Sequence, residues 1–378
     1  MRGSILGSLS GGIVLLSSLL LSDVTNATHT TPQIHTLPPL REQAEIVDGW
    51  TADRRALVPE MLRKYDIDAW LISQREYAED TTFWALKDFV QFSARRRTTE
   101  LFLARPLPNG ESNETSYSWI DNTPRVWEEL RDVLAAAAPR SIALNTASEL
   151  AFSGGLHAGE RDAIAAGLGD EWAGKFVLEP MLGIELIARM VPDRLSWYRK
   201  MMETAWAIIE EGFSSKVIVS NETTTEDVVW WMRERIQSLN YTTWFQPGVF
   251  VLTEDDLPAE HESPLVSPDH VIRYGDIIHT DFGVTALGLN TDTQHLGYVL
   301  NPGETADDIP QGFLDGLKKV NRLQDITREN MKIGLTGNEI LKNILAQAHA
   351  EGIEGKIYCH ATGEFGHSAG TVIGKSYS

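Results

Sequence analysis

The sequence is poor in residues that could cross-link the chain and in basic residues. It has one cysteine, Cys359, so no internal disulfide can form and the chain must depend on its apolar core for stability. Basic residues are also scarce, with 33 Lys and Arg against 53 Asp and Glu and a formal net charge of −20. Nucleic acid and anionic membrane surfaces are therefore poor partners. At 378 residues with 42% hydrophobic side chains, the chain is long enough for two folded domains.

The first 27 residues predict an export signal. Arg2 supplies a short positive region, Leu9 to Leu21 a mostly apolar run, and Thr25 to Ala27 a cleavage site of small residues. The apolar run is shorter than the ~20 residues that span a bilayer as a helix, although an uncleaved membrane anchor is the alternative. Three N-x-S/T triplets follow, at Asn113, Asn221 and Asn240. We therefore expect a secreted glycoprotein with no membrane attachment after signal cleavage.

The rest of the chain divides into a lead-in and two regions. Residues 28–50 are rich in Thr and Pro without periodicity, which predicts an extended lead-in. Residues 51–180 alternate helical and strand patterns, which predicts a small α/β domain. Its strands are expected at 69–73, 101–104, 117–120 and 141–145, and its helices around 57–65 and over 125–137.

Residues 191–378 form the second region. It opens with an amphipathic pattern over Leu195 to Phe213, which predicts a long helix. Helix starts with capping boxes are expected later in the region. The candidate boxes are Thr223 with Glu226, Thr224 with Asp227 and, about 110 residues later, Thr336 with Glu339. The recurrence of a long helix, a capped helix and apolar strands suggests an internal duplication.

The stretch HTDFGVTALGLNTD at residues 279–292 predicts a β-hairpin that carries two aspartates. A turn centred at 286–287 would place Asp281 and Asp292 directly opposite each other, with both side chains on one face. The nearest basic side chain in the local sequence is Arg273, so a divalent cation is the simplest way to offset the repulsion between the carboxylates. Two alternatives stay open: a pair that shares a proton, or a register shifted by one residue, which would make both ordinary surface residues.

A second stretch, YCHATGEFGHSAG, places His360 and His367 in a glycine-rich segment. Glycines let the backbone bring an imidazole close to a metal or a substrate. A lone histidine in such a segment is more often solvated. Its interpretation therefore depends on the other motifs in the sequence.

Together HTDFG, LNTDTQ and GHSAG, in this order, resemble the pita-bread metallopeptidases, the family of Xaa-Pro aminopeptidase, prolidase, methionine aminopeptidase and creatinase. The segments TTTEDVVWWMRERI and NTDTQHLGYVLNPGE look especially like secreted or bacterial proteins of the Xaa-Pro aminopeptidase type. The resemblance covers motifs over Leu195 to Gly374 and the architecture of 51–180. It implies an α+β fold, in which a C-terminal pita-bread domain over 191–378 follows a smaller N-terminal α/β domain. It also implies a short peptide substrate of the Xaa-Pro type and allows a homodimer.

The resemblance further implies a metal site. The family binds two divalent metal ions, often manganese, cobalt or zinc, through two aspartates, one histidine and two glutamates. By position, Asp281 matches the first aspartate, Asp292 the bridging second and His367 the histidine. Manganese is the favoured metal, and a hydroxide held between the ions would attack the scissile carbonyl. A further family histidine, which contacts substrate, is matched by His261, about three residues further from Asp281 than the family spacing.

Two departures from the family pattern affect the expected activity. The family usually carries another histidine seven residues after the histidine ligand, and Gly374 occupies that position here. The two glutamates belong on strands that would follow Ser378, where the sequence ends, so the pita-bread domain is expected to be partial, with an unpaired sheet edge. The three remaining ligands are expected to hold metal weakly or partially and to support little activity.

Two functions of different classes are therefore expected. One is a secreted dinuclear metallopeptidase of the Xaa-Pro aminopeptidase type, represented by a chain that is incomplete at its C-terminus. The alternative is a non-catalytic pita-bread protein that binds peptides or a protein partner. A metal-free creatinase-like hydrolase is disfavoured because Asp281, Asp292 and His367 are present together.

Overall fold

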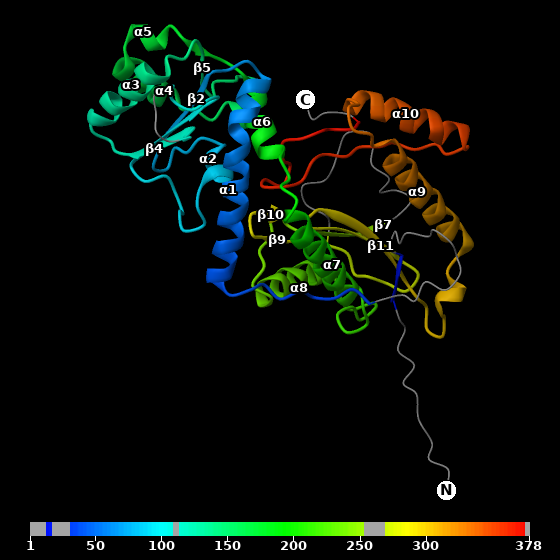
Figure 1. The fold of residues 1–378 in the computed structure, drawn as a ribbon. Helices are drawn as coiled ribbons and strands as arrows, with labels where there is room; N and C mark the ends of the chain where they lie inside the picture. Colours follow the sequence, from blue (N-terminus) through cyan, green and yellow to red (C-terminus); the bar gives the residue numbers. More distant parts are fainter. Residues whose placement is uncertain (1–12, 17–30, 109–112, 253–268, 375–378) are drawn as a thin grey trace. The chain divides into compact units, whose positions relative to one another are not determined.

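The structure is a computed structural model that describes residues 13–16, 31–108, 113–252 and 269–374. Within these ranges the chain forms two compact units (Figure 1). The N-terminal unit comprises Pro38–Leu195 and Gly363–Gly370. The C-terminal unit comprises Ser196–Thr362 and the described parts of Met1–Leu37 and Thr371–Ser378. One short segment near the end of the chain therefore packs with the N-terminal unit.

A five-stranded mixed sheet forms the centre of the N-terminal unit, with the order β4-β3-β2-β5-β6. Strand β2 pairs antiparallel with β3 and parallel with β5, so one half of the sheet is antiparallel and the other parallel. The strands are β2 (Ala69–Arg75), β3 (Arg97–Leu103), β4 (Ser116–Ile120), β5 (Ile142–Ala143) and β6 (Phe176–Val177).

Helices cover both faces of this sheet because alternate residues of a strand point to opposite sides. Trp70 and Phe102 pack with α1 and α6 on one face, while Leu71 and Leu101 pack with α3, α4 and α5 on the other. The helices are α1 (Leu40–Lys64), α2 (Phe83–Leu86), α3 (Arg125–Ala137), α4 (Ala158–Leu168), α5 (Asp170–Ala173) and α6 (Pro180–Ala188), with a 3₁₀ turn at Ala151–Ser153. The unit is thus a three-layer α/β arrangement.

The first helix corrects one prediction. Residues 28–50 were expected to be extended, but α1 begins at Leu40, directly after Pro39. Helix-favouring Leu, Arg, Glu, Gln and Ala dominate residues 40–45, whereas the Thr- and Pro-rich composition ends at Pro39. Trp50 and Thr51 are buried on this helix, so core packing stabilises the part that composition alone did not predict.

A four-stranded antiparallel sheet forms the centre of the C-terminal unit, in the order β1-β11-β8-β7, and a short hairpin, β9-β10, extends it. The strands are β1 (Ile13–Leu16), β7 (Gly248–Leu252), β8 (Ile277–Phe282), β9 (Thr285–Ala286), β10 (Leu289–Asn290) and β11 (Thr293–Val299). The helices are α7 (Arg194–Gly212), α8 (Thr225–Ser238), α9 (Gln311–Asn330) and α10 (Gly337–Ala350), with a 3₁₀ turn at Ala306–Asp308.

Two of the predicted capping boxes are present. Thr224 caps α8 through Asp227, and Thr336 caps α10 through Glu339, each with reciprocal side-chain and backbone bonds. The third candidate is wrong, because the Thr223 hydroxyl accepts from the backbone N–H of Val219 instead.

The predicted export signal lies mostly outside the described residues. Its residues Ile13–Leu16 form β1, which pairs antiparallel with β11 so that Ile13 lies opposite Val299. Among the described helices, none combines the length and the apolar character that crossing a membrane requires.

Candidate metal centre

The hairpin that carries the two aspartates turns at Leu287 and Gly288. Both residues have positive φ, 53° and 67°, which is the conformation of a type I′ turn and suits the twist of the flanking strands. The turn therefore lies one position later than the sequence predicted. As a consequence, β8 and β11 pair in a register that places Asp281 opposite Gln294.

The prediction that Asp281 and Asp292 lie directly opposite each other is thus wrong by two residues. Asp292 precedes Gln294 by two positions, just before β11 begins. Since strand side chains alternate with a period of two, a shift of two residues keeps both carboxylates on the same face. Gln294 lies beside them, with its Nε2 3.5 Å from Asp281 Oδ2 and its Oε1 3.1 Å from the His279 ring.

The connection between the two aspartates requires a glycine at one position. A Cβ added at Gly283 would lie 2.1 Å from the carbonyl oxygen of Thr291, so no larger residue fits. The same carbonyl accepts a hydrogen bond from Trp244 Nε1 at 2.9 Å. Close packing of these backbones fixes the segment that leads into Asp292.

The carboxylates influence each other's protonation. The pKa of Asp281 is raised to about 6, first because the group is partly buried, then because of the negative charge of Asp292 and a hydrogen bond between the two carboxyl groups. Asp281 Oδ1 is buried and accepts no hydrogen bond from the residues that the structure describes. No Lys or Arg in the described ranges forms an ion pair with either aspartate, so a cation would fit between them.

The histidine that lies beside these aspartates in the C-terminal unit is His360. Its Nε2 is 3.3 Å from Asp292 Oδ2, and both side chains are largely shielded from solvent. The other ring nitrogen, Nδ1, lies 3.1 Å from the carbonyl oxygen of Ala361, a contact in which Nδ1 carries the hydrogen. Two backbone hydrogen bonds between Cys359 and Ile373 fix the chain just before His360. Asp292 and His360 thus offer a carboxylate and an imidazole at contact distance, and Asp281 lies beside Asp292. Carboxylate oxygens and imidazole nitrogens are ligands that suit Mn²⁺, Co²⁺ or Zn²⁺.

The two other predicted histidines, His367 and His261, stay predictions. His367 is exposed on the segment Gly363–Gly370, which belongs to the N-terminal unit. His261 lies outside the described residues. The sequence did single out His360, through its glycine-rich surroundings, but the predicted ligand set did not include it. The contact with Asp292 in the folded chain was needed to identify His360 as a candidate ligand.

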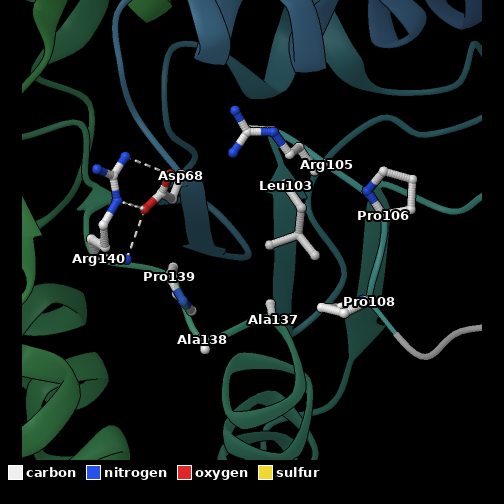
Figure 2. A pocket seen from close by; sticks show the side chains of 10 residues that line it. Asp68, Leu103, Arg105, Pro106, Pro108, Ala137, Ala138, Pro139 and Arg140 are labelled. Atoms are coloured by element: carbon white, nitrogen blue, oxygen red, sulfur yellow. Dashed lines mark hydrogen bonds and ion pairs between the residues drawn. The ribbon is translucent and has the colours of Figure 1, made fainter.

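The N-terminal unit contains a pocket of about 300 Å³ where β3 ends and β2 begins (Figure 2). Leu103, Pro106, Pro108 and Ala137 line it, together with Arg105 and an Asp68–Arg140 ion pair. Asp68 is already bound by Arg140 through three hydrogen bonds. The lining contains no histidine, cysteine, serine or other candidate catalyst, so we do not assign chemistry to this pocket.

The chain is similar to several solved structures. One is the X-Pro aminopeptidase from Thermotoga maritima MSB8, at 16% identity and a TM-score of 0.54, covering 82% of this chain and 83% of that one. Another is the Xaa-Pro dipeptidase from Bacillus anthracis, at 15% identity and a TM-score of 0.54, covering 85% and 84%. The chain has the pita-bread fold. The fold predicted from the motifs is therefore confirmed.

The same fold also occurs in a protein of a different description. The N-terminal domain of the FACT complex subunit SPT16 from Eremothecium gossypii matches at 11% identity and a TM-score of 0.54, covering 86% of this chain and 84% of that one. No family model and no curated protein matches the sequence. Because one fold can host different functions, the activity must be argued from the site.

Proposed function

We propose that this pita-bread protein is a secreted, divalent-metal-dependent peptidase that cleaves short peptides of the Xaa-Pro type. One observation carries the proposal: the carboxylates of Asp281 and Asp292 share a face beside the His360 imidazole, and no Lys or Arg in the described ranges pairs with them. In the metal-free chain the hydrogen bond between the two carboxyl groups offsets part of their repulsion, and a bound cation would offset more of it. The named activities of the X-Pro aminopeptidase and Xaa-Pro dipeptidase structures support the substrate class.

In this proposal Asp281, Asp292 and His360 hold the metal. The proposed ligand atoms include the buried Asp281 Oδ1 and the His360 Nε2, which lies 3.3 Å from Asp292 Oδ2. When bound, a divalent ion polarises a peptide carbonyl and lowers the pKa of water, which provides a nucleophile at neutral pH. Manganese is the proposed ion, with cobalt or zinc as alternatives.

His360 also accounts for one departure from the family pattern. If His360 takes the place of the histidine ligand, then His367 follows it by seven residues, at the spacing where the resemblance implies a second histidine. His367 would then contact the substrate or the transition state instead of the metal. A histidine would then not be required at position 374, where this chain has a glycine.

Metal titration of single variants distinguishes these assignments. We expect Mn²⁺ to bind the wild-type chain, as measured by isothermal titration calorimetry, and His360→Ala to lose more than 100-fold in affinity because a ligand is removed. We expect His367→Ala to keep its affinity and to lower kcat for an Xaa-Pro peptide by roughly 100-fold or more, as for a general acid–base or oxyanion contact. His349→Ala, which changes an exposed histidine on α10, is the matched control.

The reverse result would assign the metal to His367, as the sequence predicted. A wild-type chain that binds none of Mn²⁺, Co²⁺ and Zn²⁺ would contradict the proposed function and favour the non-catalytic binding protein. Two ions per chain would show that ligands beyond these three side chains take part.

Export is part of the proposal and has support from side-chain positions. The asparagines of all three acceptor triplets are exposed, as an attached glycan requires. Two of them, Asn221 and Asn240, have positive φ and lie in turns. Asparagine tolerates this backbone conformation, which is common in surface turns.

A further inference from the structure

Helix α7 packs against β11, and its residue Tyr198 lies near the candidate metal centre. Near the C-terminal end of the helix, Phe213 lies against Gly297, where an added Cβ would be 2.9 Å from the Phe213 ring. About two helical turns earlier, the Trp206 ring lies 6.2 Å from the ring of His295. Further toward the N-terminal end of α7, Tyr198 lies close enough to Asp292 for the charge of Asp292 to act on its phenol.

Tyr198 is the α7 residue at that point. Its hydroxyl lies 2.8 Å from the Thr362 hydroxyl, two residues after His360. Burial raises the pKa of the Tyr198 phenol, the hydrogen bond with Thr362 lowers it, and the charge of Asp292 raises it further. The phenol therefore lies within electrostatic reach of one candidate ligand and bonds to the segment that carries another.

His360 is thus held from two sides. Before it, Cys359 exchanges two backbone hydrogen bonds with Ile373, at 2.8 and 2.9 Å. After it, Thr362 is fixed by the bond to Tyr198. In the described residues the second anchor depends on a single pair of hydroxyl groups, and its donor–acceptor geometry is lost if either hydroxyl is removed.

We propose that Tyr198 is a positioning residue, which fixes Thr362 and thereby orients the His360 imidazole toward Asp292 for metal binding. The inference rests on the proposed function, since it assigns a role at the same site. Partners that orient metal ligands typically change metal affinity by 10- to 100-fold when they are removed. Tyr198 does not itself bind the metal in this proposal.

The test removes one hydroxyl at a time. Tyr198→Phe and Thr362→Val are each expected to lower Mn²⁺ affinity by 10- to 100-fold, and the double variant to be no weaker than the weaker single variant. Thr362→Ser, which keeps the hydroxyl, is expected to restore binding close to wild type. The absorption bands of bound Co²⁺ should shift in Tyr198→Phe, because they report the arrangement of the ligands and a purely structural role would not change them.

Tyr65→Phe is the matched control. It removes a phenol that donates to Glu185 at 2.6 Å in the N-terminal unit, and it should leave Mn²⁺ affinity unchanged. Wild-type affinity and an unshifted Co²⁺ spectrum in Tyr198→Phe, with His360→Ala unable to bind, would overturn this inference alone. A wild-type chain that takes up no metal would overturn the proposed function and this inference together.

Discussion

Asp281 retains its proton to a higher pH than an ordinary aspartate does. Its pKa is raised to about 6 by burial and by Asp292, whereas an unperturbed aspartate has a pKa of about 3.9. Between these values the folded chain binds more protons than the unfolded chain. The free energy of unfolding of the metal-free protein therefore falls as pH rises through this window.

Asp281→Asn should remove this pH dependence. In the presence of a chelator, we expect wild type to lose roughly 1 to 3 kcal/mol of stability relative to the variant as pH rises from about 4 to about 6.5. Urea denaturation at several pH values measures the difference, which reports the titration of the Asp281–Asp292 pair because titrating groups away from the pair cancel in the comparison. Saturating Mn²⁺ should reverse the loss in wild type, since the ion replaces the proton. Parallel stability curves for the two proteins would contradict the raised pKa.

At the scale of elements, the sequence predicted what local chemistry determines. The capped starts of α8 and α10 were predictable because each box involves residues only three apart. The pairing register of the hairpin was not, because Leu287 adopts a positive φ that sequence rules assign to Gly or Asn. The prediction that the two aspartates share a face of the sheet still holds, because the register differs from the predicted one by an even number of residues.

The segment Gly363–Gly370 was beyond sequence reasoning because its contacts are distant along the chain. Glu364 Oε2 accepts from Arg54 Nη2 at 2.9 Å and from Arg194 Nη2 at 3.0 Å, across 310 and 170 residues. Both guanidinium side chains are only 3% exposed. Nearby, Phe365 packs with Phe152 at a ring separation of 5.5 Å. One carboxylate therefore compensates two buried cations and holds the segment that carries His367.

Glu364→Ala should destabilise the protein strongly. The variant leaves two buried guanidinium groups without their carboxylate, which typically lowers the free energy of unfolding by roughly 3 to 5 kcal/mol. Arg125→Ala is the control, because Arg125 is 76% exposed in its pair with Glu129 and should contribute less than about 1 kcal/mol. Urea denaturation followed by circular dichroism compares the two. Equal effects would mean that another anion satisfies both arginines.

For the whole molecule, the proposed export signal includes four residues that also form a strand of the sheet. The proposed signal covers residues 1–27, and Ile13–Leu16 within it form β1 on the outer edge of β11. Cleavage after Ala27 would remove this strand and leave the backbone N–H and C=O groups of that edge without partners. An exposed strand edge is a template for pairing with another chain.

A chain that begins at Thr28 should therefore self-associate more than the full chain. Analytical ultracentrifugation over a range of concentrations is expected to show dimers or larger species of the shortened chain, because two β11 edges can pair. A β11 substitution to proline at Tyr298, which lies opposite Val14, removes one backbone donor and should reduce the association if the chain still folds. N-terminal sequencing of the protein recovered from a secreting host shows whether the proposed signal is removed. If the form that begins at Thr28 is monomeric and as stable as the full chain, β1 makes no contribution to the fold, and the signal can be removed without consequence for the sheet.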